Sequence, residues 1–147
     1  MKRPPNIAIA GIAAVVAFSA ILLVRTLVKQ PPGRWFADES LAFERARDEH
    51  KAVVIDLTAT WSVPSVEMSR KLDNLEEVLD RDFIRLRIDV SNQDERTESI
   101  RLRYDAETMP VVLFVDVNGT VLARVVQNLD ARQLRQVIAT AAKQRSN

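Results

Sequence analysis

The amino-acid sequence predicts an α/β fold: a mixed sheet with helices on both faces, preceded by one N-terminal transmembrane helix. Within residues 37–147, short runs rich in β-branched residues alternate with helix-like segments. Helices between successive strands indicate parallel crossovers. Asn118-Gly119 separates the last two runs and indicates an antiparallel hairpin at the sheet edge. An uncharged stretch from Ile7 to Val24 predicts the transmembrane helix.

The uncharged stretch is 18 residues long, and Ser19 is its one polar member. As a helix it would measure about 27 Å at about 1.5 Å per residue, close to the thickness of the hydrocarbon core. A cleaved signal peptide is the alternative, but its apolar core usually has about 7–15 residues. We therefore expect an anchor over residues 1–29. Two prolines and a glycine at 31–33 end any helix, so a linker is expected over residues 30–36.

The soluble part, residues 37–147, begins with three elements that have clear signals. Asp38 is a suitable N-cap for a helix that runs to about Glu49. The run Ala52–Thr58 is apolar enough for a strand buried on both faces. Pro64 fits the first turn of a helix over Val63–Leu72.

Weaker signals predict the other elements. They are a short edge strand at Trp35-Phe36, a helix over 74–80, a strand over 83–90, a helix over 94–104, strands over 111–115 and 121–126 joined by a type I′ turn at Asn118-Gly119, and a last helix capped by Asp130.

Composition excludes several classes of function. All 20 acidic residues follow residue 37, and 16 basic residues follow Arg34, so the soluble part carries a net charge of −4. The basic residues form no block, and no nucleic-acid partner is expected. The chain has no cysteine and one histidine, His50, which excludes disulfides and leaves no expected metal site or cofactor. The acidic residues at 76–82 lack the spacing of a calcium loop.

Three features occur together near the end of the first long strand. The strand ends at Trp61, a helix opens at Ser62-Val63-Pro64-Ser65, and Met109-Pro110 precedes the last pair of strands. This arrangement resembles the thioredoxin superfamily, in which Trp-Cys-x-x-Cys lies at a strand-to-helix turn and faces a cis-proline loop. The resemblance is closest to the thioredoxin-like periplasmic domain of bacterial membrane thiol:disulfide interchange proteins. It covers residues 37–142.

In this chain, Ser62 and Ser65 stand where the resembling family has its two redox cysteines. The family chemistry needs a thiolate, stabilised by a helix N-terminus, and a second cysteine that resolves the mixed disulfide. A serine hydroxyl stays protonated and forms no exchangeable sulfur–sulfur bond, so no thiol–disulfide activity is expected. A serine nucleophile would need a base, but His50 precedes the strand that Ser62 follows and is expected at the opposite end of the sheet. Either serine is instead expected to cap the helix.

The resemblance implies further site residues. Asp56 matches the buried acid of the family, which serves the resolving cysteine; here it is either a structural carboxylate or a relic of an active ancestor. If Asp56 is buried, its pKa should be raised. A peptide-binding groove, with Trp61 as either a lining or a core residue, is expected from these positions: Trp61, Val63, Pro64, Met109 and Pro110.

The leading functional interpretation is a non-catalytic module that binds a protein or peptide partner in the groove between Ser62 and Pro110. One alternative is a Cys-to-Ser form of an active thiol–disulfide oxidoreductase, and another is an anchor whose groove is unused. The expected location is a bacterial inner membrane, with a single span and the soluble domain in the periplasm. The positive charges flanking the span are nearly balanced, so they set its orientation weakly.

Overall fold

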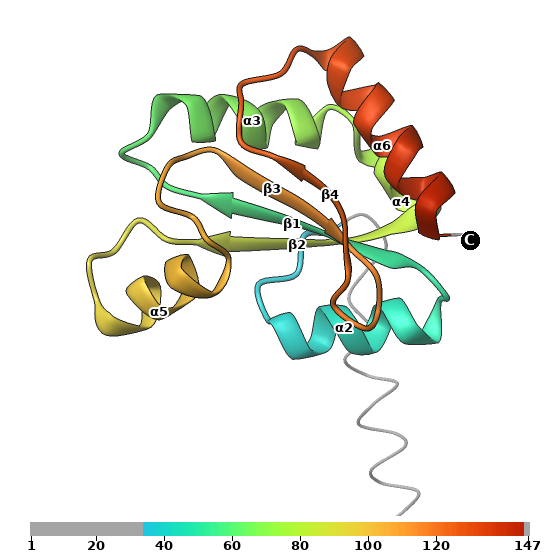
Figure 1. Cartoon of the computed structure of the whole chain (residues 1–147), viewed down its shortest axis with the longest axis horizontal. Helices are drawn as coiled ribbons and strands as arrows, with labels where there is room; N and C mark the ends of the chain where they lie inside the picture. Colours follow the sequence, from blue (N-terminus) through green and yellow to red (C-terminus); the bar gives the residue numbers. More distant parts are fainter. Residues whose placement is uncertain (1–33, 146–147) are drawn as a thin grey trace, which may run out of the picture. The chain divides into compact units, whose positions relative to one another are not determined.

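A sheet of four strands lies at the centre of the protein in the computed structural model, which describes residues 34–145 (Figure 1). The strand order is β2-β1-β3-β4. β1 and β2 are parallel and β4 is antiparallel to β3, so the sheet is mixed as predicted. However, β3 is also antiparallel to β1, so the parallel crossover predicted between the second and third strands is wrong. The reason is that α5 stays at the end of the sheet where β2 ends, and β3 starts from that same end. The strands are β1 (Ala52–Thr58), β2 (Phe83–Asp89), β3 (Val111–Val115) and β4 (Val121–Val125).

Helices cover both faces of the sheet, as the sequence predicts (Figure 1). One face carries α2 (Glu39–Asp48) and α5 (Glu95–Arg103). The other carries α3 (Val63–Asp73), α4 (Glu76–Asp82) and α6 (Ala131–Arg145). α3 and α4 connect the parallel strands β1 and β2 by a crossover on one face, whereas α5 connects β2 to β3 on the other face.

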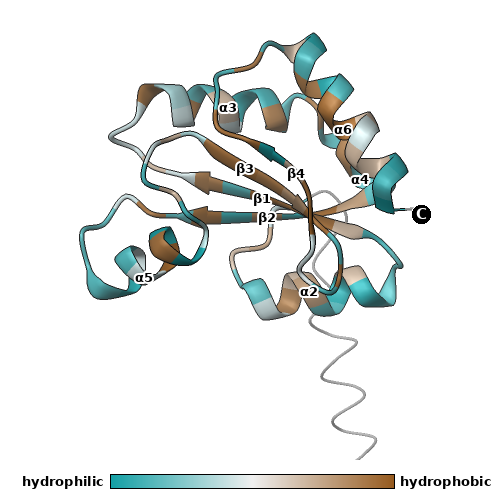
Figure 2. Ribbon diagram, viewed as in Figure 1, coloured by the Kyte–Doolittle hydropathy of each residue, from teal (hydrophilic) through white to brown (hydrophobic). Residues whose placement is uncertain are grey.

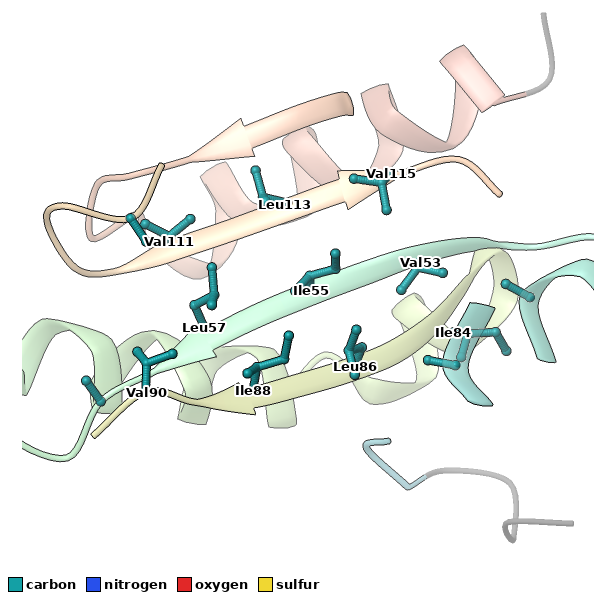
Figure 3. Packing of buried hydrophobic residues seen from close by; sticks show 14 residues of the cluster. Val53, Ile55, Leu57, Ile84, Leu86, Ile88, Val90, Val111, Leu113 and Val115 are labelled. Carbon is teal, nitrogen blue, oxygen red and sulfur yellow. The ribbon is translucent and has the colours of Figure 1, made fainter. Parts of the chain in front are cut away.

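The sheet separates two hydrophobic cores because side chains alternate along each strand. Figure 3 shows Val53, Ile55 and Leu57 of β1 beside the apolar residues of β2 and β3 in the core that faces α2 and α5. Val54 belongs to the core on the opposite face, which includes residues of α3 and α6. In Figure 2, β3 is brown along its length, whereas the helices alternate between teal and brown. Asp56 lies two residues after Val54, so its side chain points to the same face of the sheet, toward α3.

Short polar side chains set the helix starts that the sequence predicts. The Leu41 backbone N–H donates to Asp38 at 3.0 Å, and Thr97 donates to Asp94 at 2.7 Å. Before α6, Asp130 and Gln133 exchange two such bonds, at 2.8 and 2.9 Å. The helix predicted over 74–80 instead spans 76–82, because Asn74 is still the C-cap of α3.

The type I′ turn predicted at Asn118-Gly119 is wrong. Along residues 34–145, Gly119 has a positive φ of 87°, but Asn118 is not among the positive-φ residues. The Asp116 carboxylate accepts the backbone N–H groups of Asn118 and Thr120, each at 2.8 Å. Asp116 therefore organises a loop that is wider than a two-residue turn and has one left-handed residue. The pairing of β3 with β4 shifts register between Phe114 and Val115, just before this loop.

The predicted anchor over 1–29 lies outside the described residues. Within residues 34–145, no helix has the length and apolar character needed to cross a membrane. The segment predicted as a short edge strand makes a single parallel bridge, from Phe36 to Leu86 of β2. Its two hydrogen bonds, Phe36 N–H to Arg85 O at 2.7 Å and Arg87 N–H to Phe36 O at 2.8 Å, join residues 35–36 to the outer edge of β2.

Candidate functional site

The candidate site lies at the edge of the sheet where β1, β2 and β4 end and β3 begins. β1 and β2 are parallel, and β4 follows β3 back in the direction of β1, so their carboxyl ends meet at this edge. Leu57 pairs with Val111 in the antiparallel register. Continuing that register places Met109 and Pro110 opposite the turn that leads from β1 to Ser62.

Ser62 is the N-cap of α3. Its backbone is extended, with φ −108° and ψ 104°, and its hydroxyl accepts the Ser65 backbone N–H at 3.4 Å. Its own N–H donates to the Ala59 carbonyl at 3.0 Å, which closes the turn after β1. The side chain is nearly buried, and Pro64 follows in the first helical turn. These contacts give Ser62 the capping role expected of it.

Ser65 is fully buried, and its hydroxyl is used twice. It accepts the Ala59 backbone N–H at 3.1 Å and donates to the Leu57 carbonyl at 3.4 Å. The hydroxyl therefore satisfies two backbone groups at the end of β1 and fastens the start of α3 to that strand. His50 precedes β1 and so lies at the opposite end of the sheet, too far away to act as a base for either serine.

Asp56 is fully buried in the middle of β1, on the α3 side of the sheet. Its Oδ2 accepts from Arg87 Nε at 2.8 Å, while its Oδ1 accepts no hydrogen bond from any group within residues 34–145. Burial raises the pKa of this carboxyl above its ordinary value, and the Arg87 guanidinium opposes that rise. The ion pair with Arg87 gives Oδ2 a structural role. Oδ1 remains a buried acceptor outside that pair.

Arg87 also joins two further elements. Its Nη2 donates to the Ser69 carbonyl at 3.2 Å and to Asp73 at 3.0 Å, both on α3. Its guanidinium lies 4.1 Å from the centre of the Trp35 ring, and Trp35 Nε1 donates to the same Asp73 oxygen at 2.8 Å. The buried acid is thus linked through Arg87 to the segment that enters the domain.

Sequence reasoning missed this network, although β2 holds a signal for it. In FIRLRID, arginines alternate with apolar residues in a strand that is mostly buried. Arginine is rarely buried unless it is paired. Arg85 is only 2% exposed and binds Asp80 at 2.9 Å and Glu76 at 3.3 Å. Two acidic residues of α4 therefore pair with Arg85, and no metal-binding group of three acidic or histidine side chains occurs within residues 34–145.

The predicted groove residues are mostly accessible. Trp61 is 53% exposed, which excludes the interpretation that it is a core residue, and Val63 is 69% exposed. Pro64 is exposed, Met109 is half-buried and Pro110 is buried. The Met109–Pro110 peptide bond is cis. The sheet edge therefore presents apolar side chains on both sides of the serine turn.

A central mixed sheet in the order β2-β1-β3-β4, with a capped helix opening directly after β1 and the Met109-Pro110 loop beside it, defines a thioredoxin-fold domain. Residues 34–117 match the model of a family described as thioredoxin-like. The chain belongs to this family. It carries Ser-Val-Pro-Ser in place of the Cys-x-x-Cys motif that the sequence resemblance implies.

Solved structures with the same fold include proteins of disulfide exchange. A disulphide-isomerase candidate from Bacteroides thetaiotaomicron is 24% identical, with a TM-score of 0.60 over 78% of this chain and 97% of that one. The C-terminal domain of Neisseria meningitidis DsbD, in its oxidised form, is 23% identical, with a TM-score of 0.57 over 70% and 95%. A disulphide isomerase from Xylella fastidiosa Temecula1 is 19% identical, with a TM-score of 0.54 over 78% and 98%.

The family model and the solved structures agree on a thioredoxin-like fold for this domain. At these identities the structural matches show the fold alone. A search of curated protein sequences finds no match.

Proposed function

We propose that this protein is a membrane-anchored thioredoxin-like module that binds a protein or peptide segment without catalysing thiol–disulfide exchange. The observation that carries the proposal is the contrast at the sheet edge. The hydroxyls of Ser62 and Ser65 are engaged in backbone hydrogen bonds, whereas Trp61 and Val63 beside them are exposed. Exposed apolar side chains that gather at one edge are typical of an interaction surface.

The chain has no sulfur nucleophile with which to exchange a disulfide. Ser65 could not resolve a mixed disulfide, and no histidine is near enough to activate Ser62 as a nucleophile. The groove itself needs no sulfur, because an extended segment binds through its backbone and through apolar side chains that fit beside Trp61 and Met109. Binding is therefore the function that this geometry supports.

The anchor and the location are parts of the same proposal. The uncharged stretch at 7–24 supports a single span, and the short charged tail before it supports a domain on the periplasmic side of a bacterial inner membrane. Fusion of alkaline phosphatase or green fluorescent protein to the C-terminus tests the orientation. Phosphatase activity with weak fluorescence is the expected result, and the reverse pattern contradicts the periplasmic assignment.

An insulin-reduction assay on the full-length protein in detergent tests the lack of redox activity. The wild-type chain should show no turnover above the reductant alone. The matched control is Ser62→Cys/Ser65→Cys, which places two thiols at the start of α3 and should gain activity if the serine positions are equivalent to the redox pair. Turnover by the wild-type chain would overturn the proposal.

A second candidate is a Cys-to-Ser form of an active oxidoreductase. The observation that favours it is Asp56, a buried carboxylate that keeps one oxygen unbonded behind the helix of the serine pair. Comparing the codons at positions 62 and 65 in the source genome separates the two candidates. Serine codons at both positions remove the second one, and cysteine codons establish it.

A further inference from the structure

Beyond the serine turn, the exposed apolar surface continues onto α5. Leu102 is 72% exposed, and Arg101 beside it places its guanidinium 5.7 Å from the centre of the Trp61 ring. The Thr60 backbone N–H donates to the Ser91 hydroxyl at 2.9 Å, which ties the loop after β1 to the loop after β2. In Figure 1, β1 and β2 both end on the side of the sheet where α5 lies. Trp61 and α5 therefore form neighbouring parts of one surface.

A hollow of about 650 Å³ adjoins this surface on α5 and the loop before it. Leu102 supplies an apolar part of its lining. The charged groups that line it are three carboxylates and one guanidinium: Asp94, Glu95, Glu98 and Arg101.

The single guanidinium is already engaged. Arg101 lies 3.8 Å from a carboxylate oxygen of Glu98 and donates to the Ala106 carbonyl at 3.5 Å, in addition to its contact with Trp61. The Arg101 guanidinium is therefore already bound by groups of this surface and does not offset the three carboxylates. Hydrogen bonds from Thr97 hold the pKa of the Asp94 carboxyl below its usual value, which keeps that group ionised. The hollow is accordingly negative.

We infer that the segment bound in the groove continues across Trp61 onto α5, and that it is an extended protein segment in which apolar residues lie next to lysine or arginine. The apolar residues cover Trp61 and Leu102, and the basic side chain enters the hollow beside Glu95 and Glu98. This inference rests on the proposed function and specifies the chemistry of its partner. A lipid surface fits less well, because bacterial anionic headgroups are repelled by the same carboxylates.

Three synthetic fluorescein-labelled peptides test the inference by fluorescence anisotropy with the full-length protein in detergent. Each carries the same three leucines, followed by two lysines, two serines or two glutamates. The lysine peptide should bind most tightly, by up to about five-fold for each charge contact, which is the upper limit for exposed ion pairs. The preference should shrink at high salt because exposed charges are screened.

Glu95→Gln/Glu98→Gln should abolish the lysine preference while leaving the serine peptide unaffected. The matched control is Glu77→Gln, an exposed acidic residue on α4 away from this surface, which should keep the preference. Thermal unfolding of each variant checks that the fold is intact. A lysine preference that survives in Glu95→Gln/Glu98→Gln overturns the inference.

The outcomes separate this inference from the proposed function. Equal binding of the three peptides by the wild-type chain, lost in Trp61→Ala, overturns the inference and leaves the groove as a binding site. If no peptide binds and Trp61→Ala changes nothing, the proposed function fails as well. Reconstitution into phosphatidylglycerol vesicles tests the lipid alternative. A blue shift of Trp61 emission there, measured against Trp61→Phe and accompanied by loss of lysine-peptide binding, would assign the surface to lipid.

Discussion

Replacement of Arg87 by methionine would leave the Asp56 carboxylate buried and unpaired. Asp56 is fully buried, and Arg87 donates a hydrogen bond to its Oδ2 at 2.8 Å. Breaking a buried ion pair by removing one partner typically costs about 3–5 kcal/mol. The Arg87 side chain is 24% exposed, so solvent already screens the pair in part, and we expect a loss near 3 kcal/mol in the free energy of unfolding.

The loss in the free energy of unfolding of Arg87→Met should depend on pH, because removing Arg87 changes the pKa of Asp56. Burial already raises the pKa of Asp56, so the folded state binds this proton more tightly than the unfolded state does. The contribution of such a group is favourable at low pH and is lost as the pH rises through the folded-state pKa. Removing Arg87 raises that pKa further. The deficit of Arg87→Met should therefore be small when Asp56 is protonated and should grow toward alkaline pH.

Urea unfolding of the full-length protein in detergent at about pH 5 and about pH 8, followed by circular dichroism, measures this deficit. The matched control is Asp73→Asn, which removes the more exposed partner of the same guanidinium and should cost less than about 1 kcal/mol at either pH. Equal losses in the two variants, or a loss in Arg87→Met that does not grow with pH, would refute the reasoning.

Five other substitutions test the local structure by urea or thermal unfolding. Ser65→Ala removes the partner of two backbone groups and should lower the free energy of unfolding by about 1–3 kcal/mol. Ser62→Ala removes a helix cap and should cost less, about 1 kcal/mol. The opposite order would contradict the roles assigned to the two hydroxyls. Trp35→Ala removes a ring stacked on a guanidinium and an indole hydrogen bond, for about 2 kcal/mol. Trp61→Ala should stay within about 0.5 kcal/mol because that side chain lies at the surface, and an equal loss in both tryptophan variants would contradict the exposed position of the second. Gly119→Ala meets no neighbouring atom within 4 Å but must keep a positive φ, so it should cost about 1–2 kcal/mol, and a neutral result would show that the loop relaxes.

Much of the fold could be predicted because local signals and burial agree in this chain. The run AVVIDLT is apolar in both alternating sets, which a strand between two helical layers requires. Asp38 and Asp94 precede helices at the positions where a carboxylate satisfies free backbone N–H groups. The resemblance then located the serine turn and the Met109-Pro110 loop, which pattern alone would have left among several α/β folds.

The remaining features depend on contacts between distant residues. Asp56 and Arg87 are 31 positions apart and meet only because β1 and β2 pair in parallel in one register. Trp35 lay in the predicted linker, and nothing in its local sequence indicates that it stacks on Arg87. The hairpin loop was mispredicted because the Asp116 carboxylate, rather than the Asn-Gly pair, determines its width.

The bridge at Phe36 has a mechanical consequence. Tension on the chain ahead of residue 34 reaches the domain first through two backbone hydrogen bonds to β2 and through Trp35 on its arginine. These contacts come before α2 and β1 along the chain, so a pull on the segment ahead of residue 34 acts first on them and on β2. The serine turn and Trp61 follow α2 and β1 in the chain, so the Phe36 bridge and the Trp35–Arg87 contact stand between them and such a pull.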